Sequence, residues 1–114
     1  MSYPQRGEIY WVKLDPTIGS EIAKTRPAVI ISNNIGNQHA GRVIVAPLTT
    51  AQSNKVYPFE VKVESGEGGI RQAGKILLDQ IRTVDKVRLG TKLGVLSAER
   101  MVEVNRAIRL SLAV

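Results

Sequence analysis

Residues 25–31 read TRPAVII and contain the run Ala28–Ile31, which is apolar at every position. A short run of this kind, rich in β-branched residues and without alternation, is typical of a strand that is buried on both faces or that closes a barrel. Pro27 fits the first position of such a strand, where its missing N–H is tolerated. The stretch therefore predicts a β-strand at the centre of a β-rich core.

Further short strands are expected on both sides of this run. Glu8–Leu14 combines β-branched and aromatic residues and stops at Asp15-Pro16, which is a turn signal. Polar or glycine-rich connections are expected at Thr17–Thr25, Asn33–Asn37 and Glu64–Gly69. The other expected elements are four strands and a single helical turn: Arg42–Ala46, closed or bulged by Pro47; Tyr57–Val63; Lys75–Leu78; Ile81–Val84; and the turn over Asp85–Leu89.

The last segment has a different period. Its apolar residues recur at steps of three and four: Met101, Val104, Ala107, Ile108 and Leu112. Ser97 precedes them as an N-cap, and Glu99 lies in the first turn. The sequence therefore predicts a mainly β (α+β) single domain over residues 1–114, in which a small β-barrel is closed by a C-terminal amphipathic helix.

The composition favours a polyanionic partner. The 114 residues carry 16 Lys and Arg against 10 Asp and Glu, which gives a net charge of +6. The absence of cysteine excludes disulfides and thiolate metal sites and fits a cytoplasmic protein. We expect neither a signal peptide nor a membrane-spanning segment, because charges and prolines interrupt every apolar stretch.

Four separated stretches carry a resemblance to a known family. They read RGEIYWVKLDP from Arg6, GSE followed by TRPAVIISNNIGN, APLTT from Ala46, and LLDQIRTVDKVRL from Leu77. In this order and spacing the chain resembles the MazF/PemK (Kid) family of toxin ribonucleases, from about Arg6 to the C-terminal helix. The resemblance implies an SH3-like, PemK-type barrel, a two-fold homodimer, sequence-selective cleavage of single-stranded RNA, and inhibition by a MazE-like antitoxin protein whose tail occupies the RNA groove.

The residue types favour chemistry without a metal. RNA cleavage needs a base for the 2′-hydroxyl proton, a cation for the developing phosphorane charge and an acid for the leaving 5′-oxygen. His39 is the only histidine, so a single chain has no pair of imidazoles to share these roles. No carboxylate or histidine cluster has metal-ligand spacing. We therefore expect no metal and no cofactor, and products that end in a 2′,3′-cyclic phosphate and a 5′-hydroxyl.

Three residues are the expected catalytic groups. Arg26 stays charged and can grip a phosphate with two hydrogen bonds, and the resemblance matches it to the family's catalytic arginine. Thr49 can donate its hydroxyl to a phosphate oxygen and matches the threonine at the family's scissile phosphate. Glu21 either accepts the 2′-hydroxyl proton or orients Arg26, and an exposed ion pair explains it equally well.

Asp79 is a fourth candidate. It matches an aspartate that acts as acid or base in some relatives, but Leu77 stands where those relatives carry an arginine. A structural role for Asp79, in holding either the dimer or the backbone of Asp79–Thr83, is therefore the favoured interpretation. Which group is the base and which is the acid stays open at this point.

Other polar residues of the motifs are expected to contact RNA: Ser20, Lys24, Thr50, Lys55, Tyr57, Gln80 and Arg82. Gln80 and Arg82 have an alternative role in satisfying buried backbone groups. Of the two aromatic neighbours Tyr10 and Trp11, at least one is expected in the core.

Two other functions fit the same pattern. A non-catalytic toxin of the same barrel class, similar to gyrase poisons such as CcdB, would grip a protein and cut nothing. A basic SH3-like module would bind RNA or protein only. For the homodimer, the expected apolar contact surface comes from Ile76–Leu78 and from the helix end Ile108–Val114.

Overall fold

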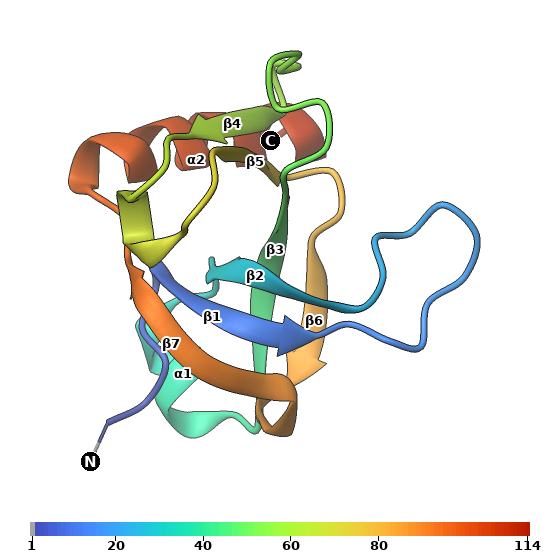
Figure 1. The fold of residues 1–114 in the computed structure, drawn as a ribbon. Helices are drawn as coiled ribbons and strands as arrows, with labels where there is room; N and C mark the ends of the chain where they lie inside the picture. The colour runs from blue at the N-terminus through green and yellow to red at the C-terminus, as the bar shows by residue number, and fades with distance from the viewer. Residues whose placement is uncertain (1) are drawn as a thin grey trace.

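The computed structural model describes residues 2–114 as a strongly curved antiparallel sheet with a helix across one end (Figure 1). The elements follow one another in this order: β1 Glu8–Lys13, β2 Thr25–Ile30, α1 Asn34–His39, β3 Arg42–Thr49, β4 Glu60–Val63, the 3₁₀ turn η1 Glu67–Gly69, β5 Gly74–Leu77, β6 Arg82–Asp85, the 3₁₀ turn η2 Lys86–Arg88, β7 Leu89–Val95 and α2 Ala98–Leu112.

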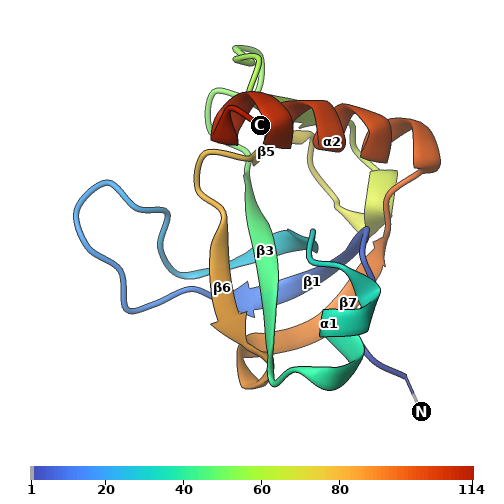
Figure 2. The same cartoon turned by 180° about the vertical axis from the view of Figure 1, so that it is seen from behind.

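Strand β3 is the hub of the sheet. Its seven strands follow the order β4-β5-β3-β2-β1-β7, with β6 paired to β3 off this path. Seen from both sides, the strands coil around one another and α2 lies across the end near β5 (Figures 1 and 2). Within the described chain the outermost strands β4 and β7 do not pair, so the barrel is open. The expected mainly β, barrel-like fold with a C-terminal helix is confirmed.

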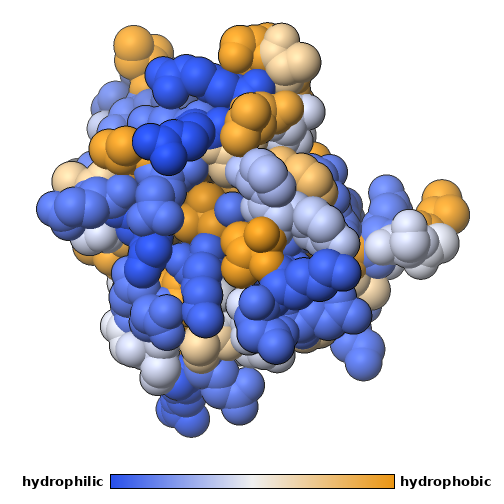
Figure 3. Space-filling model, turned by 90° about the horizontal axis from the view of Figure 1, so that it is seen from above, coloured by the Kyte–Doolittle hydropathy of each residue, from blue (hydrophilic) through white to orange (hydrophobic). Residues whose placement is uncertain are grey.

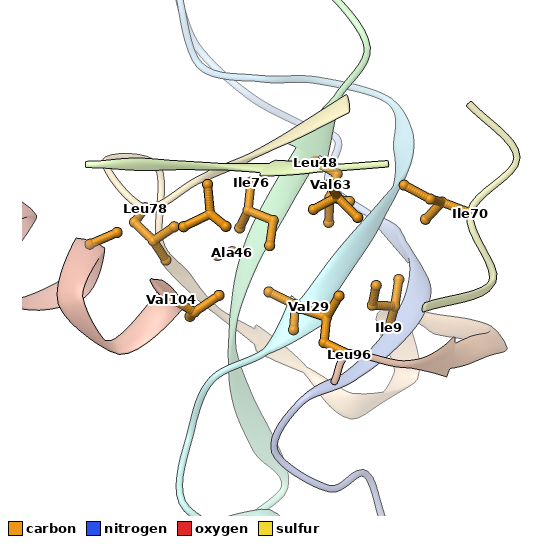
Figure 4. Close-up of a cluster of buried hydrophobic side chains, with 12 residues drawn as sticks. Ile9, Val29, Ala46, Leu48, Val63, Ile70, Ile76, Leu78, Leu96 and Val104 are labelled. Carbon is orange, nitrogen blue, oxygen red and sulfur yellow. The ribbon is translucent and has the colours of Figure 1, made fainter. Parts of the chain in front are cut away.

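Strand β2 lies between two cores. Its residues Ala28, Val29 and Ile30 are all fully buried. Val29 belongs to the larger core cluster, where Val104 of α2 points toward the strands (Figure 4). Ala28 and Ile30 belong to a second cluster that includes Val84 of β6. The prediction of a strand buried on both faces is therefore confirmed.

Helix α2 begins as the sequence predicted. The Ser97 hydroxyl oxygen accepts a hydrogen bond from the Arg100 N–H at 3.1 Å and so caps the helix. Val104 and Ala107 are buried on the inner face of the helix. Neither helix of the described chain is long and apolar enough to cross a membrane.

Pro47 does not end its strand. β3 continues to Thr49, and Pro47 pairs with Ala28 of β2. On its other edge, β3 pairs with β6 up to Val45 and with β5 from Leu48. Pro47 thus stands where the ladder on that edge is already interrupted, and the strand tolerates its missing N–H there.

The expected connection at Asn33–Asn37 is wrong, because most of it forms the short helix α1. The Asn33 side chain accepts a hydrogen bond from the Gly36 N–H at 2.7 Å and caps this helix. Buried Asn37 donates from Nδ2 to the Ser32 carbonyl at 2.9 Å. An asparagine side chain that accepts a hydrogen bond from a backbone N–H two or three residues later can form a turn, and the same hydrogen bond can cap the start of a helix.

Strand β7 has no counterpart among the expected elements. Its sequence LGTKLGV contains two glycines, which weakens a strand signal. The structure needs small residues there, because η1 crosses β7 closely. A Cβ on Gly94 would lie 2.6 Å from the Gly68 carbonyl oxygen, and one on Gly69 would lie 2.0 Å from that of Leu93.

The surface expected for a dimer is partly corrected. Ile76 and Leu78 are fully buried because they face the monomer's own core, and Leu77 between them is nearly buried as well. The end of α2 does expose apolar side chains at Leu110, Leu112 and Val114. The face that carries α2 is mostly hydrophilic, with separate hydrophobic side chains (Figure 3).

Candidate active site

The strand register brings Arg26 and Thr49 together. In the β2–β3 ladder, Ala28 pairs with Pro47 and Val29 pairs with Ala46. Arg26 and Thr49 lie two residues beyond this paired stretch, near the start of β2 and at the end of β3, so the same register directs the two residues toward each other.

Both side chains line one small hollow of about 80 Å³. Its other walls come from β2, the end of β3 with the residue that follows it, the segment before β5 and the start of β5, namely Pro27, Leu48, Thr50, Ile70, Gln72 and Gly74. Gly74 is required for this packing, because a Cβ there would lie 2.6 Å from the Thr49 carbonyl oxygen. A larger hollow of about 440 Å³ shares four of these residues and adds Trp11 and Arg71 among others. We call the two together the Arg26 groove.

The Arg26 guanidinium is held at one side only. Its Nε donates to the Ala23 carbonyl at 2.8 Å. Within residues 2–114 no carboxylate forms a salt bridge with Arg26. Its terminal nitrogens therefore keep donors for an anionic ligand such as a phosphate.

The Thr49 hydroxyl is also oriented. Its oxygen accepts a hydrogen bond from the Ala51 N–H at 3.1 Å, in a local turn that follows β3. A hydroxyl that accepts one bond still has its own hydrogen to donate. The Arg26 guanidinium and the Thr49 hydroxyl, which line one hollow, can together donate hydrogen bonds to a pentavalent phosphate and so stabilise it.

Five other candidates line a different hollow, of about 480 Å³: Ser20, Glu21, Asp79, Gln80 and Arg82, together with Ile22 and Ile81. We call this the Glu21 hollow. Ser20, Glu21 and Asp79 are exposed, whereas Gln80 and Arg82 are half-buried. The expected site residues that line these hollows thus fall into two groups rather than one, and Lys24, Lys55 and Tyr57 line neither hollow.

The loop between β1 and β2 carries Ser20 and Glu21 and projects from the barrel (Figure 1). One Glu21 carboxylate oxygen accepts from the Ile18 N–H at 2.7 Å. Exposed Lys24 has a positive φ of 71°, and its N–H donates to the Asp15 carboxylate at 3.0 Å. Two residues beyond Glu21, the Ala23 carbonyl holds Arg26, so the loop and the Arg26 groove are linked.

Gln80 and Arg82 satisfy backbone groups, as their alternative interpretation proposed. The Gln80 Oε1 accepts from the Ile22 N–H at 2.7 Å and ties the β1–β2 loop to the barrel. The Arg82 guanidinium donates to the Leu14 carbonyl at 2.9 Å. These contacts leave further donors on both side chains.

Lys55 and Tyr57 lie on the loop from Thr50 to Phe59, which joins β3 to β4. Tyr57 is 45% exposed, and its ring stacks on Phe59 with centroids 5.5 Å apart. The Lys55 Nζ lies 5.5 Å from the centre of the Tyr57 ring. An exposed ring beside a cation suits an unpaired base and its phosphate.

The aromatic pair on β1 divides as expected. Tyr10 packs on the second core cluster and its hydroxyl donates to Glu8 at 3.0 Å. Burial and the Glu8 carboxylate raise the pKa of Tyr10 to about 12. Trp11 is 40% exposed and lines the Arg26 groove.

Sequence reasoning left Trp11, Arg71 and Gln72 out of the candidate residues. For Trp11 a signal existed, because Val12 and Leu14 alternate with Trp11 and Lys13 and so place Trp11 on the outer face. Arg71 and Gln72 gave no signal, since their place in the groove depends on how η1 crosses β7. Within residues 2–114, no three or more His, Cys, Asp or Glu side chains gather as a metal site would require.

Comparisons with known proteins identify the family of the chain. Endoribonuclease MazF from Staphylococcus saprophyticus is 44% identical over 108 residues, which cover 95% of this chain and 90% of that protein. The crystal structure of MazF from Deinococcus radiodurans matches with a TM-score of 0.85, 28% identity and full coverage of both chains. A mycobacterial endoribonuclease in complex with its cognate antitoxin matches with a TM-score of 0.81 and 28% identity, over 97% of this chain and 96% of that one. Residues 5–112 match the family described as the PemK-like, MazF-like toxins of type II toxin–antitoxin systems, and the chain belongs to this family.

Proposed function

We propose that this chain is the toxin of a type II toxin–antitoxin system and acts as a metal-independent, sequence-selective endoribonuclease on single-stranded messenger RNA. The observation that carries the proposal is the hollow shared by Arg26 and Thr49. The relative from Staphylococcus saprophyticus and the mycobacterial structure are themselves named endoribonucleases. Messenger RNA is a cytoplasmic substrate, so we place the activity in the cytoplasm.

In this reaction the 2′-oxygen attacks the adjacent phosphorus, and the bond from phosphorus to the 5′-oxygen breaks. A base takes the 2′-hydroxyl proton, and an acid gives a proton to the leaving 5′-oxygen. The products are a 2′,3′-cyclic phosphate and a 5′-hydroxyl. Arg26 binds the non-bridging oxygens through its terminal nitrogens, and Thr49 donates its hydroxyl to one of them as their charge grows.

The proton carriers are proposed from the Glu21 hollow. Glu21 is the candidate base, because its exposed carboxylate lies on the loop whose Ala23 carbonyl holds Arg26. Asp79 faces the same hollow and is the candidate second carboxyl. To act as the base, Glu21 must come within hydrogen-bond reach of the 2′-hydroxyl next to the phosphate that Arg26 binds, and the projecting loop would have to carry it there.

The RNA path is proposed to follow the polar residues around both hollows: Ser20, Lys24, Thr50, Lys55, Tyr57, Gln80 and Arg82. Tyr57 and Trp11 offer exposed rings to unpaired bases. The net charge of +6 adds attraction to the phosphates that weakens with salt.

The deciding experiment incubates the purified protein with a long single-stranded RNA in EDTA and sequences the ends. We expect cuts at one short sequence, with cyclic phosphate on one side and a free 5′-hydroxyl on the other. The same sequence in duplex RNA should stay intact. Uncut single-stranded RNA would overturn the enzyme and favour a gyrase poison or a binding module, and cleavage only with a divalent ion would overturn metal independence.

Two partners are proposed beside RNA. The mycobacterial structure holds an endoribonuclease with its cognate antitoxin, and we propose a comparable antitoxin protein whose tail covers the Arg26 groove of this chain. We also propose a homodimer, in which the exposed apolar end of α2 takes part. Sedimentation at micromolar concentration tests the dimer, and a monomer there would contradict it.

A further inference from the structure

Lys75 is a buried lysine outside both hollows. Its side chain is 6% exposed and forms a salt bridge of 2.9 Å with Glu60, whose side chain is 7% exposed. Lysine is rarely buried unless it is paired, because removing an ammonium from water is costly. Because burying the Lys75–Glu60 ion pair costs desolvation energy, we asked which part of the structure the pair holds in place.

The ladder places Lys75 next to the proposed catalytic hydroxyl. In the β3–β5 pairing, Thr49 is opposite Lys75 and Leu48 is opposite Ile76. Leu48 and Ile76 point into the larger core cluster. Because side chains alternate along a strand, Thr49 and Lys75 both leave the other face of the same ladder.

The Thr50–Phe59 loop leaves the end of β3 and returns to the start of β4 (Figure 1). The Lys75 Nζ donates to the Lys55 carbonyl at 2.9 Å and to Glu60 Oε1 at 2.9 Å. The same Glu60 oxygen accepts from the Tyr57 N–H at 3.0 Å. The Lys75 Nζ also lies 5.9 Å from the centre of the Tyr57 ring. One ion pair therefore fixes the loop backbone at Lys55 and Tyr57.

We propose that Lys75, together with Glu60, is a positioning residue for RNA that sets the Thr50–Phe59 loop at a fixed place relative to Thr49. This inference rests on the proposed ribonuclease function. The loop carries the exposed Tyr57 ring and the Lys55 ammonium, which meet nucleotides that flank the cut. A loop already held in its binding shape loses less conformational freedom when RNA binds, so the pair strengthens binding without touching the reacting atoms.

A purely structural role is separable from this one. Removing either partner alone leaves a buried charge and lowers stability. In the double variant Lys75→Met/Glu60→Met, no charge is left buried, so stability recovers toward that of the wild type. The double variant still lacks the hydrogen bonds to the Lys55 carbonyl and the Tyr57 N–H, so the loop stays loose.

The test compares a long RNA with a short RNA trimmed to the mapped cut site. We measure kcat, KM and the denaturation midpoint for the wild type, the double variant and Val104→Ala, which removes core packing under α2 without touching the loop. For the double variant we expect a KM for the long RNA raised roughly tenfold, with kcat within about twofold of the wild type. The KM for the short RNA should change much less. Val104→Ala should lower the midpoint and leave the ratio of the two KM values unchanged.

Two results would overturn the inference in distinguishable ways. If the double variant keeps the wild-type ratio of the two KM values, Lys75 does not position the loop, although the ribonuclease function stands. If the wild type binds and cuts neither RNA, the ribonuclease function fails and the positioning role falls with it.

Discussion

The Arg26 groove and the Glu21 hollow are built in different ways. Arg26 and Thr49 stand on neighbouring strands, and the register that places them also packs Ala28 and Val29 into the cores. Glu21 stands on a projecting loop whose position depends on single contacts, such as the Ile22 N–H to Gln80 bond. A strand-built site is fixed by the whole fold, whereas a loop-built site can adjust when a ligand arrives.

The largest effect is expected when the Arg26 guanidinium is removed from the Arg26 groove, which is the strand-built half of the candidate site. We expect Arg26→Ala to lower kcat/KM by roughly two to four orders of magnitude, because phosphorane stabilisation is removed. Arg42→Ala is the matched control, since it removes the same charge from an exposed position at the start of β3. Circular dichroism should show both variants folded. Cleavage by Arg26→Ala at the control's rate would contradict the catalytic role.

Loss of the hydroxyl should have the next largest effect. Thr49→Val keeps the shape of the side chain, and we expect kcat to fall by about a hundredfold to a thousandfold, as for a lost oxyanion donor. Thr50→Val is the companion variant, because Thr50 lines the same hollow but is placed among the RNA contacts. There the KM should change more than kcat. If both variants lowered kcat equally, Thr49 would have no catalytic role that Thr50 lacks.

Much of the strand-built half was predictable from sequence. The apolar run after Pro27 predicted a strand buried on both faces, and the three- and four-residue period with Ser97 predicted α2. Both signals are local, since they depend on alternation, period and capping. The pairing of Arg26 with Thr49 followed only from the family resemblance, because a single sequence does not state which strands are neighbours.

The rest depended on contacts between distant segments. β7 has weak strand residues and exists because β1 pairs with it and η1 crosses it at Gly69 and Gly94. Lys75 looked like an ordinary strand residue, because its burial arises from a loop that folds back over it. Sequence gave no sign that Glu21 and Arg26 would line separate hollows, since the path of a loop is set by contacts such as that of Gln80 with Ile22.

The loop-built half is tested by Glu21→Gln, which keeps an oxygen for the Ile18 N–H but cannot take a proton at ordinary pH. If Glu21 is the base, its replacement by Gln should lower kcat by about a hundredfold. Ser20→Ala is the control on the same loop. If Glu21→Gln cleaves RNA at the rate of the Ser20→Ala control, the Glu21 carboxylate serves only to shape the loop, and another group takes the proton.

The smallest effect is expected when the ion pair between Glu67 and Arg100 is removed. This ion pair joins one wall of the Arg26 groove to α2. The Glu67 carboxylate receives two hydrogen bonds from Arg100, at 2.7 and 3.0 Å, just before the segment that carries Arg71 and Gln72. The Arg100 hydrogen bond, opposed by burial and helped by the Glu64 N–H, lowers the pKa of Glu67 below its ordinary value of 4.5. Unfolding then takes up protons in acid, so the stabilisation is present above pH 4.5 and is lost as the pH falls through the folded pKa.

Glu67→Gln should therefore lower the free energy of unfolding by about 1 kcal/mol at pH 7 and by less at pH 3, because part of the stabilisation from the ion pair is lost as the pH falls below 4.5. Denaturant titrations of both proteins at the two pH values measure this difference. Glu99→Gln, on the exposed first turn of α2, controls for loss of a charge alone. A deficit in Glu67→Gln that is equal at both pH values would show that the wall is held by packing rather than by its ion pair, and would make it resemble the strand-built half of the site.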